Sequence, residues 1–151
     1  VSDKSPPQCW PLSRLEWPLL NKFYKSQGSA MRTSDAGEAW VVRTGEIVAG
    51  LNLTPVADGQ WLTGLLVAPG HRRQGLARVL LETACGARKT WLFCHPDLQG
   101  FYEGLGFRVS EDLPQALADR LARYRRSKPL LAMRRDQSSA AGSSPGNNTS
   151  V

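Results

Sequence analysis

One stretch of the chain combines turn residues, paired arginines and a helix start in a way that suits phosphate chemistry. A strand-like run ends at Ala68, a Pro-Gly turn follows, and Arg72 and Arg73 precede a helical pattern. A helix N-terminus offers N–H groups without intrahelical partners at the positive end of the helix dipole. Gly75 and Ala77 leave room for a pyrophosphate to reach the backbone, and arginines supply donors for its oxygens. The stretch therefore predicts a phosphate-binding turn.

Two common nucleotide-binding loops do not fit this stretch. Gly70 and Gly75 have the G-x-x-x-x-G spacing of a triphosphate loop, but Leu76 and Ala77 stand where Lys and Ser/Thr are required. No G-x-G-x-x-G occurs, which disfavours a dinucleotide fold. The structural alternative, a solvated arginine pair beside a simple glycine turn, stays open on these residues alone.

Two motifs in order resemble the GNAT N-acetyltransferase family. Arg72-x-x-Gly75-x-Ala77 matches the family's Q/R-x-x-G-x-G/A acyl-CoA-binding signature in the same strand–turn–helix setting. The segment from Phe101-Tyr102 to Gly106-Phe107 resembles the family's F-Y-x-x-x-G-F segment, with one buried strand between the two motifs. The resemblance covers residues 39–107 well and the flanks more loosely. It implies an acyltransferase that moves an acetyl group from acetyl-CoA to a primary amine by direct attack.

The resemblance also implies a role for each residue of these motifs. In such enzymes the pantetheine arm lies beside the strand before the loop, so backbone groups of Leu66, Val67 and Ala68 are expected to bind it. A backbone N–H there is expected to polarise the thioester carbonyl. Tyr102 is expected to protonate the departing thiolate as general acid, with a core aromatic as its alternative role. The pyrophosphate is expected to rest on Arg72, Arg73, Gln74, Gly75, Leu76 and Ala77. No metal is implied.

The general base is not legible in the sequence. A Glu on the strand before the loop serves in some relatives, but the run Trp61–Val67 carries no acid. Glu38, His95 and Asp97 are unranked candidates, and a water chain is the alternative. Cys94 ends the next strand and could line the thioester pocket, although a buried strand cysteine is more often inert than nucleophilic.

Composition sets the broad class of the protein. The chain has 151 residues, 41% hydrophobic and 21% charged, with a formal net charge of +6. These values exclude wholesale disorder and a fibrous repeat, and the positive field favours anionic partners such as coenzyme A. Three cysteines without C-x-x-C spacing argue against a disulfide framework and fit a reducing compartment. With no apolar run long enough to span a bilayer and no leader-like start, the sequence predicts a cytoplasmic protein without a membrane partner.

Two alternatives remain beside the enzyme. The first is a non-enzymatic acyl-CoA-binding module that regulates a partner, which the missing strand carboxylate keeps open. The second is a nucleic-acid-binding protein, disfavoured because no stacking aromatic interleaves with the basic run. For the enzyme, the sequence leaves open whether the chain forms a homodimer and whether the acceptor is a small molecule or a protein or peptide amine. The basic run comprises Arg120, Arg123, Arg125, Arg126 and Lys128.

The elements that position these residues alternate between two periodicities. A capping box at Ser13-x-x-Glu16 predicts a helix that Pro18 breaks or delays. The last helix is expected to begin after an N-cap at Asp112, with Pro114 in its first turn. The other expected segments are strands at 39–43, 46–53, 61–68, 89–94 and 130–134, and helices at 75–87 and 98–105.

This order predicts an α/β (α+β) fold in one domain. Strands at the front are antiparallel neighbours and a crossover follows, so the expected sheet is central, mixed and mostly antiparallel, with helices flanking it. Residues 11–137 are expected to form the acyltransferase domain, preceded by a loose segment at 1–10. The stretch 138–151 has no charge and little bulky apolar surface, which predicts a disordered tail.

Overall fold

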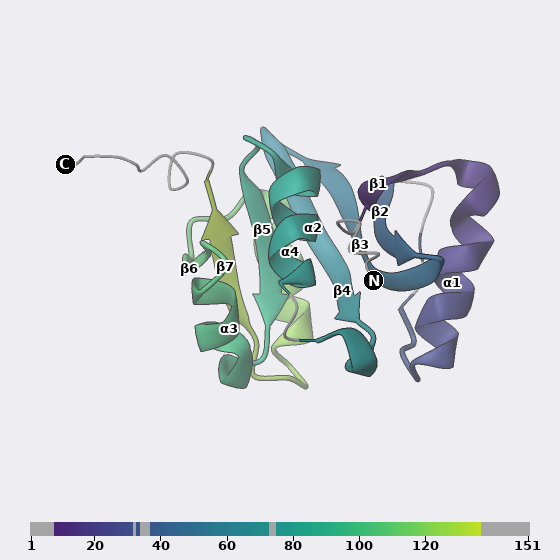
Figure 1. Ribbon diagram of the computed structural model, residues 1–151. Helices are drawn as coiled ribbons and strands as arrows, with labels where there is room; N and C mark the ends of the chain where they lie inside the picture. Colours follow the sequence, from purple (N-terminus) through teal and green to yellow (C-terminus); the bar gives the residue numbers. More distant parts are fainter. Residues whose placement is uncertain (1–7, 32, 34–36, 73–74, 137–151) are drawn as a thin grey trace. The chain divides into compact units, whose positions relative to one another are not determined.

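The computed structural model describes residues 8–31, 33, 37–72 and 75–136 (Figure 1). Arg73, Gln74 and the segment 138–151 therefore lie outside the described residues. Within the described ranges the chain forms seven strands and four α-helices with both parallel and antiparallel pairing, which places it in the α/β class. Its residues pack as two compact units, one from Val1–Thr54 with Leu62–Ala84 and one from Pro55–Trp61 with Cys85–Val151.

The first unit contains the strand order β1-β2-β3-β4. Strands β1 and β2, and likewise β2 and β3, are antiparallel neighbours. Helix α1 packs against buried side chains of this unit and lies alongside β1 and β2 in Figure 1. The elements are β1 (Gln8–Leu12), α1 (Trp17–Ser26), β2 (Glu38–Thr44), β3 (Glu46–Val56), β4 (Gly59–Val67) and α2 (Leu76–Cys85).

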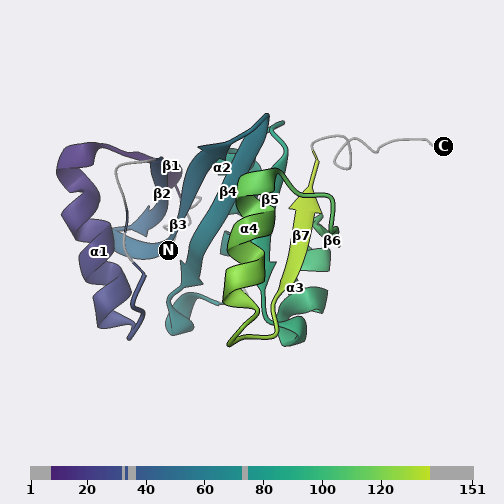
Figure 2. The same cartoon turned by 180° about the vertical axis from the view of Figure 1, so that it is seen from behind.

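The second unit contains the order β4-β5-β7-β6, to which β4 contributes its first residues. Gln60 and Trp61 pair in parallel with Thr90 and Trp91, whereas β7 is antiparallel to both of its neighbours. Helix α4 lies in front of β5 in Figure 2, and α3 lies on the opposite face (Figure 1). The elements are β5 (Thr90–Cys94), α3 (Gln99–Glu103), β6 (Arg108–Val109), α4 (Gln115–Tyr124) and β7 (Leu131–Arg135).

Two strands were not expected from the sequence. β1 lies in a segment that we expected to be loose as far as residue 10, yet Gln8–Leu12 pairs with β2 in continuous register. It is an edge strand, the position in a sheet that tolerates a proline such as Pro11. β6 has only two residues, too few for a periodic pattern. Both strands exist because a partner distant in sequence supplies the hydrogen bonds.

The start of α1 agrees with the expected delay at Pro18, although without the expected cap bonds, whereas the start of α4 differs from expectation. The Ser13 hydroxyl donates to the Glu16 carboxylate over 3.2 Å in place of a capping box, and α1 starts late, at Trp17, with Pro18 in its first turn. Asp112 does not cap α4, which begins at Gln115; its carboxylate instead lies 3.7 Å from Arg134.

Candidate active site

The stretch that the sequence predicts to bind phosphate lies between β4 and α2. Ala68 ends the strand segment by donating its N–H to the Val48 carbonyl over 2.8 Å, and its own carbonyl accepts from the His71 N–H over 2.9 Å. Pro69–His71 forms a single 3₁₀ turn, the compact reversal that the Pro-Gly pair predicts. The strand therefore delivers the chain to the start of α2 through a short, hydrogen-bonded loop.

Gly75 gives this loop its conformation. Its φ is +76°, in the left-handed region that favours glycine, and a Cβ built there would meet nothing within 4 Å. The Gly75 carbonyl accepts from Val79 over 3.1 Å, the first bond of the helix, while Leu76 anchors the helix in the core at 2% exposure. The N–H groups of the first turn have no intrahelical acceptor, and the open space at Gly75 lets an anion approach them.

Arg72 is exposed and folds back on the strand that precedes it. Its Nε donates to the Val67 carbonyl over 2.9 Å. This bond uses one of the five guanidinium donors, so the terminal nitrogens keep the geometry suited to a phosphate. Arg73 and Gln74, the other polar residues expected here, lie outside the described residues.

At the end of β4, the side chains and backbone groups of successive residues point in opposite directions. The side chains of Leu66 and Ala68 pack against the core cluster under α1. Ala68 directs its N–H toward β3, and because successive residues of a strand alternate, Val67 directs its own N–H and carbonyl to the opposite edge. The bond from Arg72 to the Val67 carbonyl agrees with this direction.

Tyr102 lies on α3 in the second unit. Its ring makes edge-to-face contacts with Phe101 and Phe107, at centroid distances of 5.0 and 5.8 Å. Its carbonyl accepts from the N–H groups of Leu105 and Phe107, which ties the helix to the buried Phe107. The tyrosine-containing motif thus builds a turn whose Gly106 has a φ of +96°. The phenol itself has no hydrogen-bond partner among the described residues.

The Tyr102 phenol is shifted toward its protonated form. Burial raises its pKa to about 12, and the neighbouring Cys94 adds to the shift when its sulfur is negatively charged. A group with this pKa carries its proton throughout the neutral range, which is the state required of a proton donor.

Cys94 has the environment of an unreactive thiol. It is buried on β5, its sulfur lies 3.6 Å from the Met133 sulfur, and desolvation raises its pKa. Because the thiolate is the nucleophile, a raised pKa disfavours covalent chemistry at Cys94.

The three candidates for the general base are exposed: Glu38 lies on β2, and the other two lie in the turn that follows β5. Glu38, on β2, accepts from the Trp40 indole over 3.1 Å. His95 uses Nδ1 to accept the Asp97 N–H over 3.1 Å, and this contact caps the 3₁₀ turn at Pro96–Leu98. The structure thus brings His95 and Asp97 together in a local turn, with a structural role for the imidazole. Within the described ranges, no three His, Cys, Asp or Glu side chains gather to hold a metal ion.

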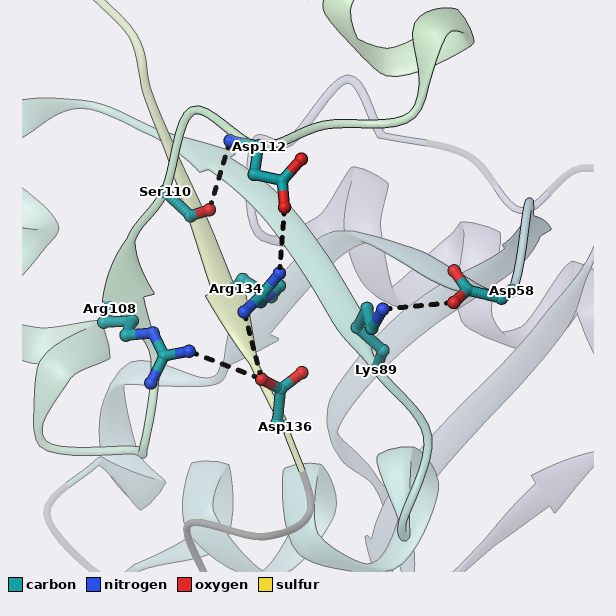
Figure 3. A network of polar contacts seen from close by, with 7 residues as sticks. All are labelled: Asp58, Lys89, Arg108, Ser110, Asp112, Arg134 and Asp136. Atoms are coloured by element: carbon teal, nitrogen blue, oxygen red, sulfur yellow. Dashed lines mark hydrogen bonds and ion pairs between the residues drawn. The ribbon is translucent and has the colours of Figure 1, made fainter.

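The second unit holds another set of charged groups, shown in Figure 3. Arg134 lies between Asp112 and Asp136, at 3.7 and 3.3 Å, and Asp136 also lies 3.5 Å from Arg108. Lys89 is 3.1 Å from Asp58 and holds the pKa of that carboxyl below its usual range. The positive and negative charges in this network balance, so we interpret it as a set of structural ion pairs around β6 and β7.

The basic run on and after α4 is partly used within the unit. The Arg120 guanidinium stacks on Trp61 at 4.5 Å from the ring centroid, and Arg125 pairs with Glu111 at 3.1 Å. An aromatic side chain therefore does meet this run, contrary to the sequence pattern, but it comes from β4 and stacks on an arginine of the same chain. This contact gives the nucleic-acid alternative no added support.

The sequence motifs did not point to one residue of β4, Gly64. Gly64 lies inside β4 with a φ of +67°, and its carbonyl accepts from the Tyr24 hydroxyl over 2.7 Å. An isolated glycine inside a strand pattern is the available sequence signal, because such a glycine often marks a bulge.

No helix in the described part of the chain is long and apolar enough to cross a membrane.

Comparisons with known proteins bear on the family and the fold of this chain. Residues 35–109 match the model of the acetyltransferase (GNAT) domain. The fold is similar to a GNAT-family acetyltransferase from Staphylococcus aureus Mu50, with a TM-score of 0.62, 16% identity, and coverage of 87% of this chain and 99% of that one. It is also similar to the ribosomal-protein-S18-alanine N-acetyltransferase of Escherichia coli, with a TM-score of 0.61, 19% identity, and coverage of 93% and 97%.

A third similar structure contains coenzyme A. It is the N-acetylglutamate synthase of Neisseria gonorrhoeae complexed with coenzyme A and N-acetyl-glutamate, with a TM-score of 0.66 and 13% identity. The match covers 90% of this chain and 36% of that one. No curated protein matches the chain significantly. The matched residues 35–109 and the α/β fold together show that this chain contains a GNAT acetyltransferase domain, a family whose acyl donor is acetyl-CoA.

Proposed function

We propose that this protein transfers an acetyl group from acetyl-CoA to a primary amine by direct attack, with Tyr102 as general acid. The observation that carries the proposal is the loop from Ala68 to Leu76, where an exposed arginine and an unobstructed glycine adjoin the start of a ten-residue helix. A pyrophosphate fits such a start because the N–H groups and the dipole both favour negative charge.

The coenzyme A phosphates are assigned to this loop. Gly75, Leu76 and Ala77 offer backbone N–H groups, and Arg72 offers the terminal nitrogens of its guanidinium. The resemblance of the sequence to the family adds Arg73 and Gln74 to these proposed phosphate-binding residues. The open space at the Cβ position of Gly75 supports the fit, since any side chain there would occupy the path of the phosphates.

The pantetheine arm is assigned to the backbone of Leu66, Val67 and Ala68. Val67 has the strongest support of the three, because its polar backbone groups face away from β3, whereas the Ala68 N–H already bonds to Val48 on β3 and the Ala68 carbonyl to His71 in the loop. A backbone N–H in or next to this segment of β4 polarises the thioester carbonyl as the acceptor attacks.

The reaction then needs two proton movements. The neutral amine nitrogen forms a bond to the acetyl carbon, and the carbon–sulfur bond breaks with its electrons on sulfur. Tyr102 donates its phenolic proton to that sulfur and regains one from solvent, while the new amide nitrogen loses its extra proton. The raised pKa of Tyr102 keeps its phenol protonated, the state from which it can donate. The strand segment Trp61–Val67 carries no carboxylate, so we assign proton removal from the amine to water.

The acceptor is a primary amine of a small molecule or of a protein or peptide. Neighbours of similar fold include an N-acetyltransferase named for an alanine of ribosomal protein S18 and a spermidine N-acetyltransferase chimera. Their names span both kinds of acceptor. The free state of Cys9, Cys85 and Cys94 supports a reducing location such as the cytoplasm.

A second candidate function is a non-enzymatic acyl-CoA-binding module. The absence of an acidic residue from Trp61–Val67 favours it, because that strand then offers no base. Both candidates require acetyl-CoA binding, and only the enzyme releases thiol.

The deciding experiment has two arms. Calorimetric titration measures acetyl-CoA binding, and a thiol reagent follows coenzyme A release with a panel of polyamines, amino acids, peptides with free N-termini and lysine peptides. Binding with amine-dependent thiol release supports the enzyme. Binding without release from any amine supports the module, and the lack of binding overturns both. Salt-dependent RNA binding without acetyl-CoA binding would point to the nucleic-acid alternative.

A further inference from the structure

Gly64 lies inside strand β4, two residues before the segment Leu66–Ala68 that is assigned to the pantetheine arm, and its backbone departs from strand geometry. The φ of +67° at Gly64 is a conformation that strands do not otherwise use. A glycine in this conformation inside a strand redirects the backbone groups that follow.

A side chain of α1 holds this peptide. The Tyr24 hydroxyl donates to the Gly64 carbonyl over 2.7 Å, and the Asn52 amide nitrogen donates to the Tyr24 hydroxyl oxygen over 3.0 Å. A hydroxyl has one proton, and here the carbonyl receives it, so Asn52 must present its NH₂ group to the oxygen. The order of donors and the orientation of the Asn52 amide are therefore determined.

The series of hydrogen bonds from Asn52 through Tyr24 to Gly64 is buried, and its burial lowers the stability of the fold. Tyr24 is 0% exposed and Asn52 is 6% exposed. Within the described part of the chain, the Asn52 Oδ1 has no hydrogen-bond partner. A buried acceptor without a partner destabilises the fold, so an apolar residue of similar size would be the more stable choice at this position. Stability alone does not account for Asn52.

Space at Gly64 is closed by the same side chains. A Cβ built there would lie 2.8 Å from the Tyr24 hydroxyl, 3.0 Å from the Asn52 amide nitrogen and 2.6 Å from Met31 Cγ. The glycine and the two polar side chains therefore form one packed arrangement, and a side chain at Gly64 would displace the hydrogen bonds.

Fixing the Gly64 carbonyl also fixes the next N–H. The Gly64 carbonyl and the Leu65 N–H belong to one planar trans peptide, in which they point in opposite directions. With the carbonyl held toward Tyr24 on α1, the Leu65 N–H is directed away from that helix. Leu65 lies two residues before Val67, on the same side of the strand repeat.

We infer that Tyr24 and Asn52 are positioning residues that hold the Gly64 peptide so that the Leu65 N–H points at the thioester carbonyl of bound acetyl-CoA. The inference rests on the proposed function. It assigns the polarising N–H to one peptide and explains why a buried amide with an unpartnered oxygen lies beneath it. Neither side chain touches the reacting atoms.

The test uses acetyl-CoA labelled with ¹³C at the thioester carbonyl and isotope-edited infrared spectroscopy of the bound complex. A hydrogen bond from an N–H lowers the carbonyl stretching frequency. In Tyr24→Phe the band is expected to move back toward its position in free acetyl-CoA. The kcat for thiol release is expected to fall about ten- to a hundredfold, the scale of a small misplacement at a reaction centre, with acetyl-CoA affinity within about threefold of wild type.

The matched control is Leu20→Val, one turn earlier on the same helix. Leu20 is fully buried in the same core cluster and makes none of these hydrogen bonds, so it reports general loosening. It is expected to lower the melting temperature while leaving the band and kcat in place. Asn52→Leu is the second variant if Tyr24→Phe does not fold; it is expected to match or exceed wild-type stability and to show the same band shift.

Three results overturn the inference. One is a wild-type band position in folded Tyr24→Phe or Asn52→Leu. Another is an equal shift in Leu20→Val, which would make the effect one of packing. The third is a lack of acetyl-CoA binding by the wild-type protein, which overturns the proposed function as well; the first two leave that function intact.

Discussion

Arg72 and Val67 are joined across the loop that separates β4 from α2: the guanidinium Nε donates to the strand carbonyl over 2.9 Å. The bond ties an exposed cation to the end of the strand assigned to the pantetheine arm. It leaves the terminal nitrogens of the exposed guanidinium for the phosphates that the loop is proposed to bind. One side chain thereby connects the two parts of coenzyme A that the loop and the strand are proposed to bind.

Replacing Arg72 with alanine should therefore weaken acetyl-CoA binding. Loss of a charge-assisted hydrogen bond is worth about 1.5–3 kcal/mol, or roughly ten- to a hundredfold in dissociation constant. Arg72→Lys should recover only part of this loss, because an ammonium lacks the planar fork that reaches both carbonyl and phosphate. Calorimetric titration measures the affinities. Lys25→Ala, which removes an exposed charge from α1, is the control, and an equal loss there would reduce the effect to net charge.

Gly75→Asp should abolish measurable acetyl-CoA binding, because a carboxylate would occupy the phosphate position at the helix start. The substitution also strains a backbone at φ +76°, so strain must be separated from charge. Gly28 has the same φ of +76° and equally open surroundings. Gly28→Asp therefore carries matched strain and charge, and it should bind acetyl-CoA as wild type does. Equal affinities in the two variants would remove the phosphates from this loop.

Tyr102→Phe should lower kcat by about 10²–10⁴-fold with little change in acetyl-CoA affinity. Phenylalanine keeps the ring contacts with Phe101 and Phe107, so the substitution isolates the hydroxyl. Rapid-mixing measurement of thiol release gives the chemical step directly and avoids masking by product release. Tyr124→Phe, on α4, is the matched hydroxyl deletion and should retain activity. An unchanged chemical rate in a stable Tyr102→Phe protein would return Tyr102 to a packing role.

The raised pKa of Tyr102 predicts an unusual alkaline profile. Burial raises the pKa to about 12, above the usual value of about 10, so the phenol stays protonated through pH 10. The rate should rise as the acceptor amine deprotonates and then level, without a fall below about pH 10. The same shift stabilises the fold below about pH 10, and this contribution is lost as the pH rises through the folded-state value. A decline in kcat with a midpoint near pH 9 would contradict Tyr102 as the donor.

Cys94→Ser should retain most of the activity. Burial raises the pKa of the thiol, which keeps it in the non-nucleophilic form at neutral pH, and direct attack needs no acyl-enzyme. Intact-protein mass spectrometry after mixing with acetyl-CoA should show no added acetyl group on the wild-type chain. Acetylation that disappears in Cys94→Ser, together with its activity, would establish a two-step route instead.

The loop chemistry was legible in the sequence because it depends on local rules. A Pro-Gly turn, a glycine that must adopt positive φ and a helix start act within a dozen residues, so Arg72, Gly75 and Leu76 could be assigned before the fold was known. The motif around Tyr102 was equally local. Its glycine and phenylalanine close a short helix, and the structure has that turn at Gly106 and Phe107.

Local rules failed where a distant partner decides. Asp112 has the residue type of a helix cap, but Arg134, which is distant in sequence, engages its carboxylate instead. Gln8–Leu12 has no strand pattern of its own and becomes a strand because β2 offers an edge.

The arrangement around Gly64 belongs entirely to the tertiary structure. Its three residues come from a helix and two strands: Asn52 is 28 residues and Gly64 is 40 residues from Tyr24 along the chain. None of them stands out in the sequence of its own segment. The sequence determined what local backbone conformation can supply, namely a glycine turn at a helix start, which we propose binds anions, and a tyrosine on a short helix. Only the packing of α1 against the strands decided which peptide of β4 is held and in which direction its N–H points, because that choice depends on hydrogen bonds between segments that no local pattern connects.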